Sequence, residues 1–214
     1  MIDSRGRILT LLQQRHRATA GQLAQEMGQS SASVRRHLDV LQRDQLVAFQ
    51  RAKRATGRPE HVYYLTEAGQ ALLPKGYDRL LERLLRGMTG LPKAEFGNLS
   101  GEELLQLLFR RMANQTAEGA APADQDPLSH RVARLAAILE REQFSPEITE
   151  ESGTVQICLR NCPFRSAALE ASSVCCYDQQ VISTVLGRDV VMERSIRDGD
   201  DDCLYLASAV AEGV

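Results

Sequence analysis

The strongest constraint on the fold is a series of three short amphipathic segments within the first 43 residues. Each segment places apolar side chains at helical spacing, and Val34, Leu38 and Leu41 form the clearest stripe. Small polar residues at the segment starts are typical helix N-caps, and a glycine follows the second segment as a helix C-terminal glycine would. The predicted helices are residues 3–15, 20–27 and 30–43, with caps at Ser4, Thr19 and Ser30 and a stop at Gly28.

Two segments rich in β-forming residues follow, at residues 46–51 and 61–65. The stretch between them is basic and contains Gly57 and Pro59, which predicts a loop. Three helices, the last two joined by a short turn, and then a two-stranded hairpin predict a winged helix-turn-helix. The second helix of such a pair enters the major groove of DNA, which is about 12 Å wide and admits one helix.

The face of the third helix opposite its apolar stripe carries the residues expected to contact DNA. Short side chains near the helix start allow close approach to base edges, and an arginine can form a forked hydrogen bond to guanine. Basic residues on the hairpin are expected to contact phosphates or to enter the minor groove. The predicted DNA-binding residues are Ser31, Ser33, Arg35, Arg36, Arg43, Arg51, Lys53, Arg54 and Arg58. A solvated basic helix face is the alternative interpretation.

The net charge of −2 hides an uneven distribution. Residues 1–80 contain 13 Lys and Arg against 7 Asp and Glu, whereas residues 81–214 contain 13 against 21. A basic N-terminal part favours contact with a polyanion at that end. The length suits one large or two modest domains, and the predicted fold class is α+β. It comprises a winged helix-turn-helix domain (1–75), a helical dimerisation and linker region (76–126) and a small C-terminal α+β domain (127–214).

Leucine-rich helices are predicted in the middle of the chain, at residues 77–88 and 102–112. Either could be a core helix. Because a winged helix commonly reads two half-sites as a dimer, we expect one of them to pair the subunits of a homodimer. Residues 116–127 are rich in Ala, Gly, Pro, Asp and Gln, which predicts a flexible linker or an exposed loop. A further helix is predicted at residues 128–144.

The last third of the chain holds all five cysteines. Strands are predicted at residues 154–160, 190–196 and 203–207, with a helical stretch ending at Leu186. One cysteine follows the first of these strands, one lies within or between helices, and one begins the last strand. Residues at the ends of elements can converge on one point, and these three are Cys162, Cys175 and Cys203.

The residues alone leave three interpretations of the cysteines open. Cysteine packs as a small apolar side chain, which suits Cys158 and Cys176 best. Zinc favours closely spaced cysteine pairs or added histidines, and no second well-spaced pair is present. An iron–sulfur cluster can take thiolates from separated segments, which suits the spacing Cys162-x12-Cys175-x27-Cys203.

Two stretches of the N-terminal region resemble known repressors. They are Arg-Arg-His-Leu at 35–38 and Thr-Gly-Arg-Pro-Glu-His-Val-Tyr-Tyr-Leu-Thr-Glu-Ala-Gly at 56–69. Both are similar to winged-helix repressors of the DeoR and ArsR types.

Four stretches of the C-terminal region extend the resemblance. In order, they read Asn-Cys-Pro-Phe (161–164), Val-Cys (174–175), Leu-Gly-Arg-Asp-Val (186–190) and Gly-Asp-x-x-Cys (199–203). This order resembles the SufR family of iron–sulfur repressors.

The resemblance to the SufR family implies a homodimer that carries one [4Fe-4S] cluster per subunit. It implies repression of iron–sulfur cluster assembly genes by the loaded form, with cluster loss releasing the DNA. It also implies that Cys162, Cys175 and Cys203 are thiolate ligands. Family members often have another cysteine between the last two, and this chain lacks it. The fourth ligand therefore stays open among Cys176, Cys158, Asp189 and a small exogenous ligand.

The sequence has none of the common catalytic motifs. Gly-x-Gly-x-x-Gly, Walker A, His-Glu-x-x-His and Gly-x-Ser-x-Gly are all absent, so we do not expect an enzyme. With no run of about 18 apolar residues and no apolar signal segment, we expect a cytoplasmic protein without membrane contact. The expected partners are an operator in double-stranded DNA and a second copy of the chain. The alternative function is a winged-helix regulator that uses metal-free thiol redox chemistry or contains zinc.

Overall fold

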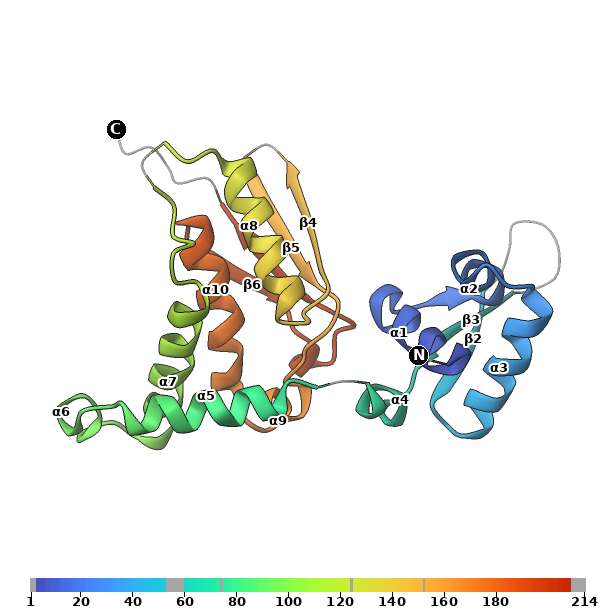
Figure 1. Ribbon diagram of the computed structural model, residues 1–214, viewed down its shortest axis with the longest axis horizontal. Coiled ribbons are helices and arrows are strands. Elements are labelled where there is room, and N and C mark those ends of the chain that lie inside the picture. Colours follow the sequence, from blue (N-terminus) through green and yellow to red (C-terminus); the bar gives the residue numbers. More distant parts are fainter. Residues whose placement is uncertain (1–2, 53–59, 74, 124, 152, 209–214) are drawn as a thin grey trace. The chain divides into compact units, whose positions relative to one another are not determined.

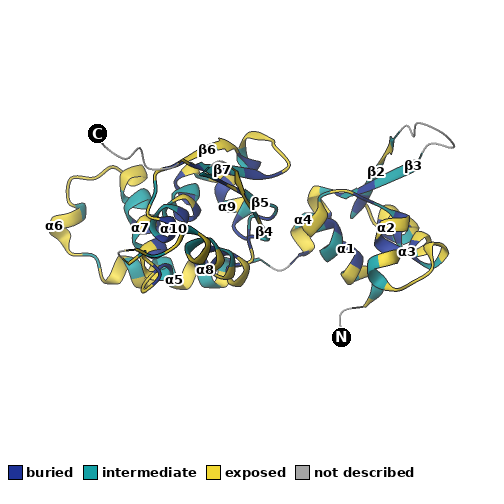
Figure 2. Cartoon of the chain, turned by 90° about the horizontal axis from the view of Figure 1, so that it is seen from above, coloured by how far each residue is buried: buried dark blue, intermediate teal, exposed yellow. Residues whose placement is uncertain are grey.

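The computed structural model describes residues 3–52, 60–73, 75–123, 125–151 and 153–208. It divides into two compact units, Met1–Pro74 (unit 1) and Lys75–Val214 (unit 2). Each unit has its own cluster of buried apolar side chains. Figure 1 shows the order of the elements, and Figure 2 shows that buried residues gather inside each unit whereas α6 (Lys93–Phe96) is mostly exposed.

Unit 1 is a bundle of helices packed on a small antiparallel sheet in the order β1-β3-β2. Its elements are α1 (Ser4–Arg15), β1 (Ala18–Thr19), α2 (Ala20–Met27), α3 (Ser31–Arg43), β2 (Val47–Ala52), β3 (Glu60–Leu65) and α4 (Glu67–Leu72). The predicted helices and hairpin strands are therefore present. Strand β1 was not predicted, because two residues carry no periodicity.

The helix caps of unit 1 follow the predicted chemistry with one correction. The N-cap of α1 is Asp3, whose Oδ1 accepts a hydrogen bond from the backbone of Gly6 at 2.8 Å, and Ser4 is the first helical residue. Thr19 begins α2 with a capping box in which its hydroxyl and the side chain of Gln22 satisfy each other's backbone N–H groups.

Unit 2 combines helices with a four-stranded antiparallel sheet in the order β4-β5-β7-β6. Its helices, besides α6, are α5 (Tyr77–Thr89), α7 (Gly101–Thr116), α8 (Leu128–Arg141), α9 (Arg165–Glu170) and α10 (Cys176–Leu186). Short 3₁₀ turns are η1 (Ser172–Cys175) and η2 (Ile196–Asp198). The strands are β4 (Pro146–Glu151), β5 (Thr154–Leu159), β6 (Val190–Arg194) and β7 (Cys203–Ala207).

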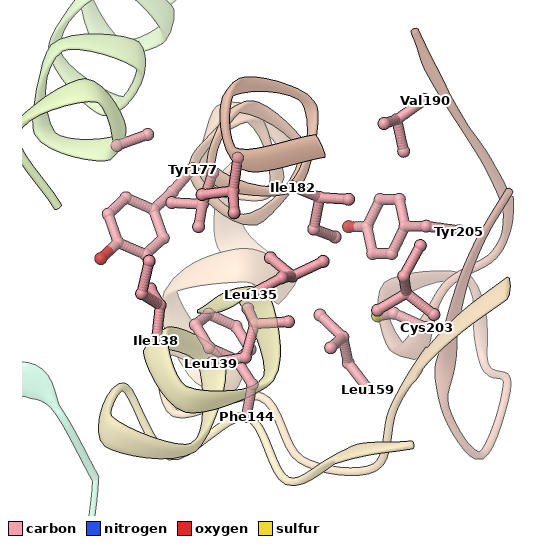
Figure 3. Packing of buried hydrophobic residues seen from close by; sticks show 14 of the residues in the cluster. Leu135, Ile138, Leu139, Phe144, Leu159, Tyr177, Ile182, Val190, Cys203 and Tyr205 are labelled. Carbon is pink, nitrogen blue, oxygen red and sulfur yellow. The ribbon is translucent and has the colours of Figure 1, made fainter. Parts of the chain in front are cut away.

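The core of unit 2 forms where α8 and α10 meet the sheet. Figure 3 shows Leu135 and Leu139 of α8, Ile182 of α10 and Tyr205 of β7 pointing into the same space. All four are buried. Burying each large apolar side chain stabilises the fold by roughly 1.5–3 kcal/mol, so this cluster fixes the helices against the strands.

Several predictions for unit 2 need correction. The helix predicted at 128–144 ends at Arg141. Strand β4 follows it and was not predicted, because its acidic residues hide the pattern of a strand. The helical stretch ending at Leu186 is divided into α9, η1 and α10. The predicted flexible linker is wrong at Ala117 and Ala120, which are buried in the core. Small apolar residues there pack closely, although their composition resembles a linker.

No helix in the described parts of the chain combines the length and the apolar character needed to cross a membrane.

Candidate nucleic-acid interface and three-cysteine pocket

The turn between α2 and α3 fixes the direction of α3. Gly28 ends α2 in the left-handed conformation, with φ of +63°, which a residue without Cβ adopts at little cost. The backbone N–H of Gln29 then donates to the carbonyl of Ala24 at 3.0 Å. Ser30 starts α3, and its hydroxyl accepts from the backbone N–H of Ser33 at 3.2 Å. Both ends of the turn are therefore fixed by local hydrogen bonds.

The two faces of α3 differ sharply in burial. Val34, Leu38 and Leu41 are fully or almost fully buried against α1 and α2. On the opposite face, Ser33 is half-buried and the longer side chains are exposed. The exposed predicted DNA-contact residues of α3 are Ser31, Arg35, Arg36 and Arg43. The helix is thus fixed by one face while its basic face is free to enter a groove.

The hairpin of β2 and β3 carries another predicted contact residue. Arg51 is exposed on β2 and pairs in register with His61 of β3. The ring of His61 stacks on Phe49 with centroids 3.9 Å apart, which stiffens the hairpin. The remaining predicted contacts, Lys53, Arg54 and Arg58, lie outside the described residues.

Three of the five cysteines line one pocket in unit 2. Cys162 lies in the turn after β5, Cys175 at the end of η1 and Cys203 at the start of β7. Register brings two of these segments together, because Leu159 of β5 pairs with Cys203. The rest of the lining is mainly apolar with a few charged groups: Phe144, Phe164, Arg165, Ala168, Val174, Asp178, Ser195, Ile196 and Arg197.

Two of the pocket sulfurs accept backbone hydrogen bonds. The N–H of Ile196 donates to Sγ of Cys203 at 3.4 Å. The backbone of Phe164 also donates to the sulfur of Cys162. Such bonds stabilise negative charge on sulfur and offset part of the effect of burial at Cys162 and Cys203.

Burial keeps the thiols of the pocket protonated. It raises the pKa of Cys175 to about 12 and that of Cys203 to about 11, and the neighbouring Asp178 adds to both shifts. The pKa of Cys162 is raised further for the same reasons. Bound thiolate therefore requires a positive group that compensates for the lost hydration.

Asp178 is a pocket residue that sequence reasoning missed. It is buried, it lies three positions after Cys175 at the start of α10, and Tyr205 donates a hydrogen bond to its Oδ2 at 2.8 Å. Burial raises the pKa of its carboxyl to about 7. The available signal was the i, i+3 spacing, which puts Cys175 and Asp178 on one helix face.

The other proposed ligands lie elsewhere in unit 2. Cys158 of β5 is half-buried, and its thiol donates to Asp202, which Arg194 also binds at 2.8 Å. Cys176 and Asp189 line a separate polar pocket together with Arg110. The structure thus brings together Cys162, Cys175 and Cys203, and it does not bring these other candidates into the lining of the same pocket.

No group of three or more His, Cys, Asp or Glu side chains within the described ranges could hold a metal ion. A buried cation, Lys75 at the start of unit 2, nevertheless acts on Cys162. Nζ of Lys75 is buried without a hydrogen-bond partner, and its charge acts on Cys162. Burial lowers the pKa of this lysine.

The first residues of unit 2 are attached to the turn that carries Cys162. The N–H of Gly76 donates to the carbonyl of Pro163 at 3.2 Å, and the N–H of Ser166 donates to the hydroxyl of Tyr77 at 3.2 Å. A Cβ on Gly76 would lie 2.8 Å from the ring of Phe164, so only glycine fits without a shift. Hydrogen bonds therefore hold residues 75–77 against residues 162–166. These two stretches together are called the entry clamp below.

A buried ionic network continues from the entry clamp along α5. Arg83 binds Glu142 through two hydrogen bonds of 3.0 Å and donates to the hydroxyl of Tyr177 at 2.7 Å. Thr116 also contacts that hydroxyl, at 2.9 Å. These partners are the C-cap residue of α8 and residues of α10 and α7, so one side chain of α5 is bonded to segments of three other helices.

Comparison with known proteins supports the N-terminal part of this description. Residues 3–48, from the start of α1 to the first residues of β2, match a family described as a helix-turn-helix domain. A helix-turn-helix domain at this position suggests a DNA-binding transcriptional regulator. No curated protein and no solved structure matches the chain.

Proposed function

We propose that this regulator is a repressor that carries a [4Fe-4S] cluster on Cys162, Cys175 and Cys203 and that releases its operator when the cluster is lost. One observation carries the proposal: cysteines from three separated segments line a single pocket. The resemblance of these segments to the SufR family supplies the cluster type, one cluster per subunit, and the control of iron–sulfur cluster assembly genes.

The donor set of the pocket fits such a group. A cluster binds each cysteine through a different iron atom, so its ligands lie further apart than those around a single ion. When bound, it would supply an oxidation-sensitive cross-link between the three segments. The backbone N–H groups of Ile196 and Phe164 favour sulfur in its charged form, and the apolar lining excludes water.

Asp178 is the side chain we propose as the fourth ligand. It is the carboxyl group in the lining of the three-cysteine pocket, and its hydrogen bond from Tyr205 fixes its orientation. Asp189 and Cys176 line a different pocket, and the thiol of Cys158 is bonded to Asp202. A carboxylate ligand would bind iron less tightly than a thiolate, which suits a site that must respond to oxidants or iron shortage.

The entry clamp gives the pocket a route to the DNA-binding unit. Cys162 belongs to the turn that Gly76 and Tyr77 contact, and residue 75 directly follows unit 1. Release of Cys162 from the cluster would therefore loosen the hold on residues 75–77, which connect unit 2 to the DNA-binding unit. This is the two-state element that a sensor needs.

The experiment is anaerobic purification with a visible spectrum and iron and sulfide assays. The samples are the wild-type chain and serine variants at each of the five cysteines. We expect cluster loss in Cys162→Ser, Cys175→Ser and Cys203→Ser, while Cys158→Ser serves as the matched control and keeps the cluster. A full cluster in Cys203→Ser would contradict the assignment. Bound zinc in a colourless protein, or neither iron nor zinc, would favour the alternative functions.

Operator release is tested with the same preparation before and after cluster removal. A duplex selected by the loaded protein from a random-sequence pool serves as the probe. We expect weaker binding after removal, and equal affinity would contradict the release mechanism.

A further inference from the structure

Lys75 carries a buried positive charge that has no partner in its surroundings. Its Nζ is shielded from solvent and forms no hydrogen bond within the described residues. Arg134 also has a buried nitrogen without a partner, but another nitrogen of its guanidinium pairs with Asp126. A buried ammonium without a counter-charge destabilises a fold, because it has lost its hydration and gained no partner in exchange. The position of Lys75 is therefore favourable only when an anion lies beside it.

Lys75 lies beside the three-cysteine pocket. The backbone N–H of the next residue, Gly76, donates to the carbonyl of Pro163 at 3.2 Å, and Pro163 directly follows Cys162. This bond brings the chain at Lys75 alongside the chain at Cys162, and the charge of the lysine acts on the cysteine sulfur. A second cation, Arg165, also acts on Lys75, so it adds to the positive charge there instead of balancing it.

Metal binding changes the charge of the three-cysteine pocket. A free cysteine is mainly a neutral thiol at neutral pH, whereas a metal binds it as a thiolate and releases its proton. Three thiolates outweigh the positive charge of the metal core that they hold, so the bound group as a whole is anionic. Lys75 therefore gains a neighbouring counter-charge when the pocket is loaded and loses it when the pocket is unloaded.

We propose that Lys75 is the counter-charge of a metal–thiolate group bound in the three-cysteine pocket, and that its unpaired charge destabilises the entry clamp when this group is absent. This role rests on the proposed function, because it requires that a metal group fills the pocket. Lys75 is the first residue of unit 2, so the destabilisation acts where the chain leads to unit 1. One positioning residue thereby favours the loaded state and opposes the unloaded one, which widens the difference between the two states.

The test compares Lys75→Met with the wild type, using the full chain with and without the bound metal group. Methionine keeps an unbranched apolar side chain at this position and removes the charge. Lys75→Arg retains a cation and tests whether charge restores the wild-type behaviour. Lys93→Met is the matched control, because Lys93 is exposed on α6.

In the unloaded protein, amide hydrogen exchange measures the stability of the entry clamp. We expect the amides of residues 75–77 and 162–166 to exchange about tenfold more slowly in Lys75→Met than in the wild type, because the variant has no unpaired buried charge. Peptides from unit 1 are the internal reference and should exchange equally in both proteins. Exchange of the entry clamp at the wild-type rate or faster would overturn the proposal.

In the loaded protein, the same substitution should have the opposite effect. Iron should pass to a chelator about tenfold faster from Lys75→Met than from the wild type, because the bound group has lost its counter-charge. Lys75→Arg should release iron more slowly than Lys75→Met, and Lys93→Met should match the wild type. A side chain that only fills space would change the loaded and unloaded proteins in the same direction. Equal release from Lys75→Met and the wild type would overturn the proposal.

Metal content separates this inference from the proposed function. If the wild type holds iron and sulfide but releases iron as Lys75→Met does, the inference fails alone. If the chain holds zinc instead, the proposed function fails, and the inference stands when zinc leaves Lys75→Met faster than it leaves the wild type. A chain that binds neither iron nor zinc would overturn both.

Discussion

The two units hold their candidate functional residues in opposite ways. In unit 1, the DNA-contact residues of α3 are exposed neighbours on one helix, and only the opposite face is committed to the core. In unit 2, the three cysteines come from a turn, a 3₁₀ helix and a strand, and they meet inside the fold. The exposed DNA-contact face therefore depends on the packing of one helix, α3. The three-cysteine pocket depends on the packing of the whole sheet of unit 2 with its helices.

The largest expected effect tests whether the two units fold independently, by a substitution in the core of one unit alone. Leu38→Ala removes a fully buried side chain from the inner face of α3, and we expect unit 1 to lose about 2–5 kcal/mol of stability. Differential scanning calorimetry of the full chain should show one transition moving to lower temperature and the other unchanged. If both transitions moved together, the units would not fold independently.

The entry clamp predicts a smaller effect that crosses from unit 2 to DNA binding. Gly76→Ala pushes a methyl group to within 2.8 Å of the Phe164 ring, and we expect a loss of about 1–3 kcal/mol in unit 2. The difference in operator affinity between the loaded and unloaded protein should shrink. Gly101→Ala is the control, because a Cβ at Gly101 meets nothing within 4 Å. If the affinity difference were unchanged in Gly76→Ala, the entry clamp would not connect the state of the pocket to DNA binding.

The exposed face of α3 predicts losses in binding without losses in stability. Arg36→Ala should cost about 1–3 kcal/mol of operator affinity if its guanidinium reads a guanine, with the same melting temperature as the wild type. Fluorescence anisotropy over a range of salt concentrations measures the effect. Arg134→Ala, on α8 of unit 2, is the matched control and should bind as the wild type does.

Comparison of the two capping boxes gives the smallest expected effect. The box of α2 uses the neutral Gln22, whereas that of α7 uses Glu103, whose pKa is lowered by its hydrogen bond with the backbone of Ser100. A lowered pKa means that the charged form stabilises the fold above the unfolded pKa, and that this stabilisation is lost as the pH falls through the folded pKa. Glu103→Gln should therefore lower the melting temperature slightly at pH 7 and not at pH 3. An equal difference at both values would contradict the charge-based explanation.

The contrast between the units also explains what the sequence could predict. The helices of unit 1 follow from local patterns: the stripe of Val34, Leu38 and Leu41, and caps such as Thr19 and Ser30. Those signals act over a few residues, so periodicity and cap chemistry are sufficient. The same patterns located β5 and β7 and put Cys162 and Cys203 at element ends.

The features that the sequence did not reveal depend on contacts between distant segments. Asp178 sits in the pocket because α10 packs on the sheet, and its side chain reads locally as an ordinary acidic residue of a helix start. Ala117 and Ala120 are buried because other elements cover them, although their segment resembles a linker. Strand β4 exists through its pairing with β5.

The sheet order of unit 2 has a consequence for the synthesis of the chain. Strand β7 comes last among the described elements, yet it lies between β5 and β6 in the sheet. Unit 1 can fold on the ribosome once residue 74 has emerged, whereas β5, which already has β4 on one side, gains its second neighbour only when residues 203–207 have been made. The three cysteines therefore meet only after residues 203–207 have left the ribosome. Any metal group that all three bind must be delivered after that point, so each chain begins its life without it.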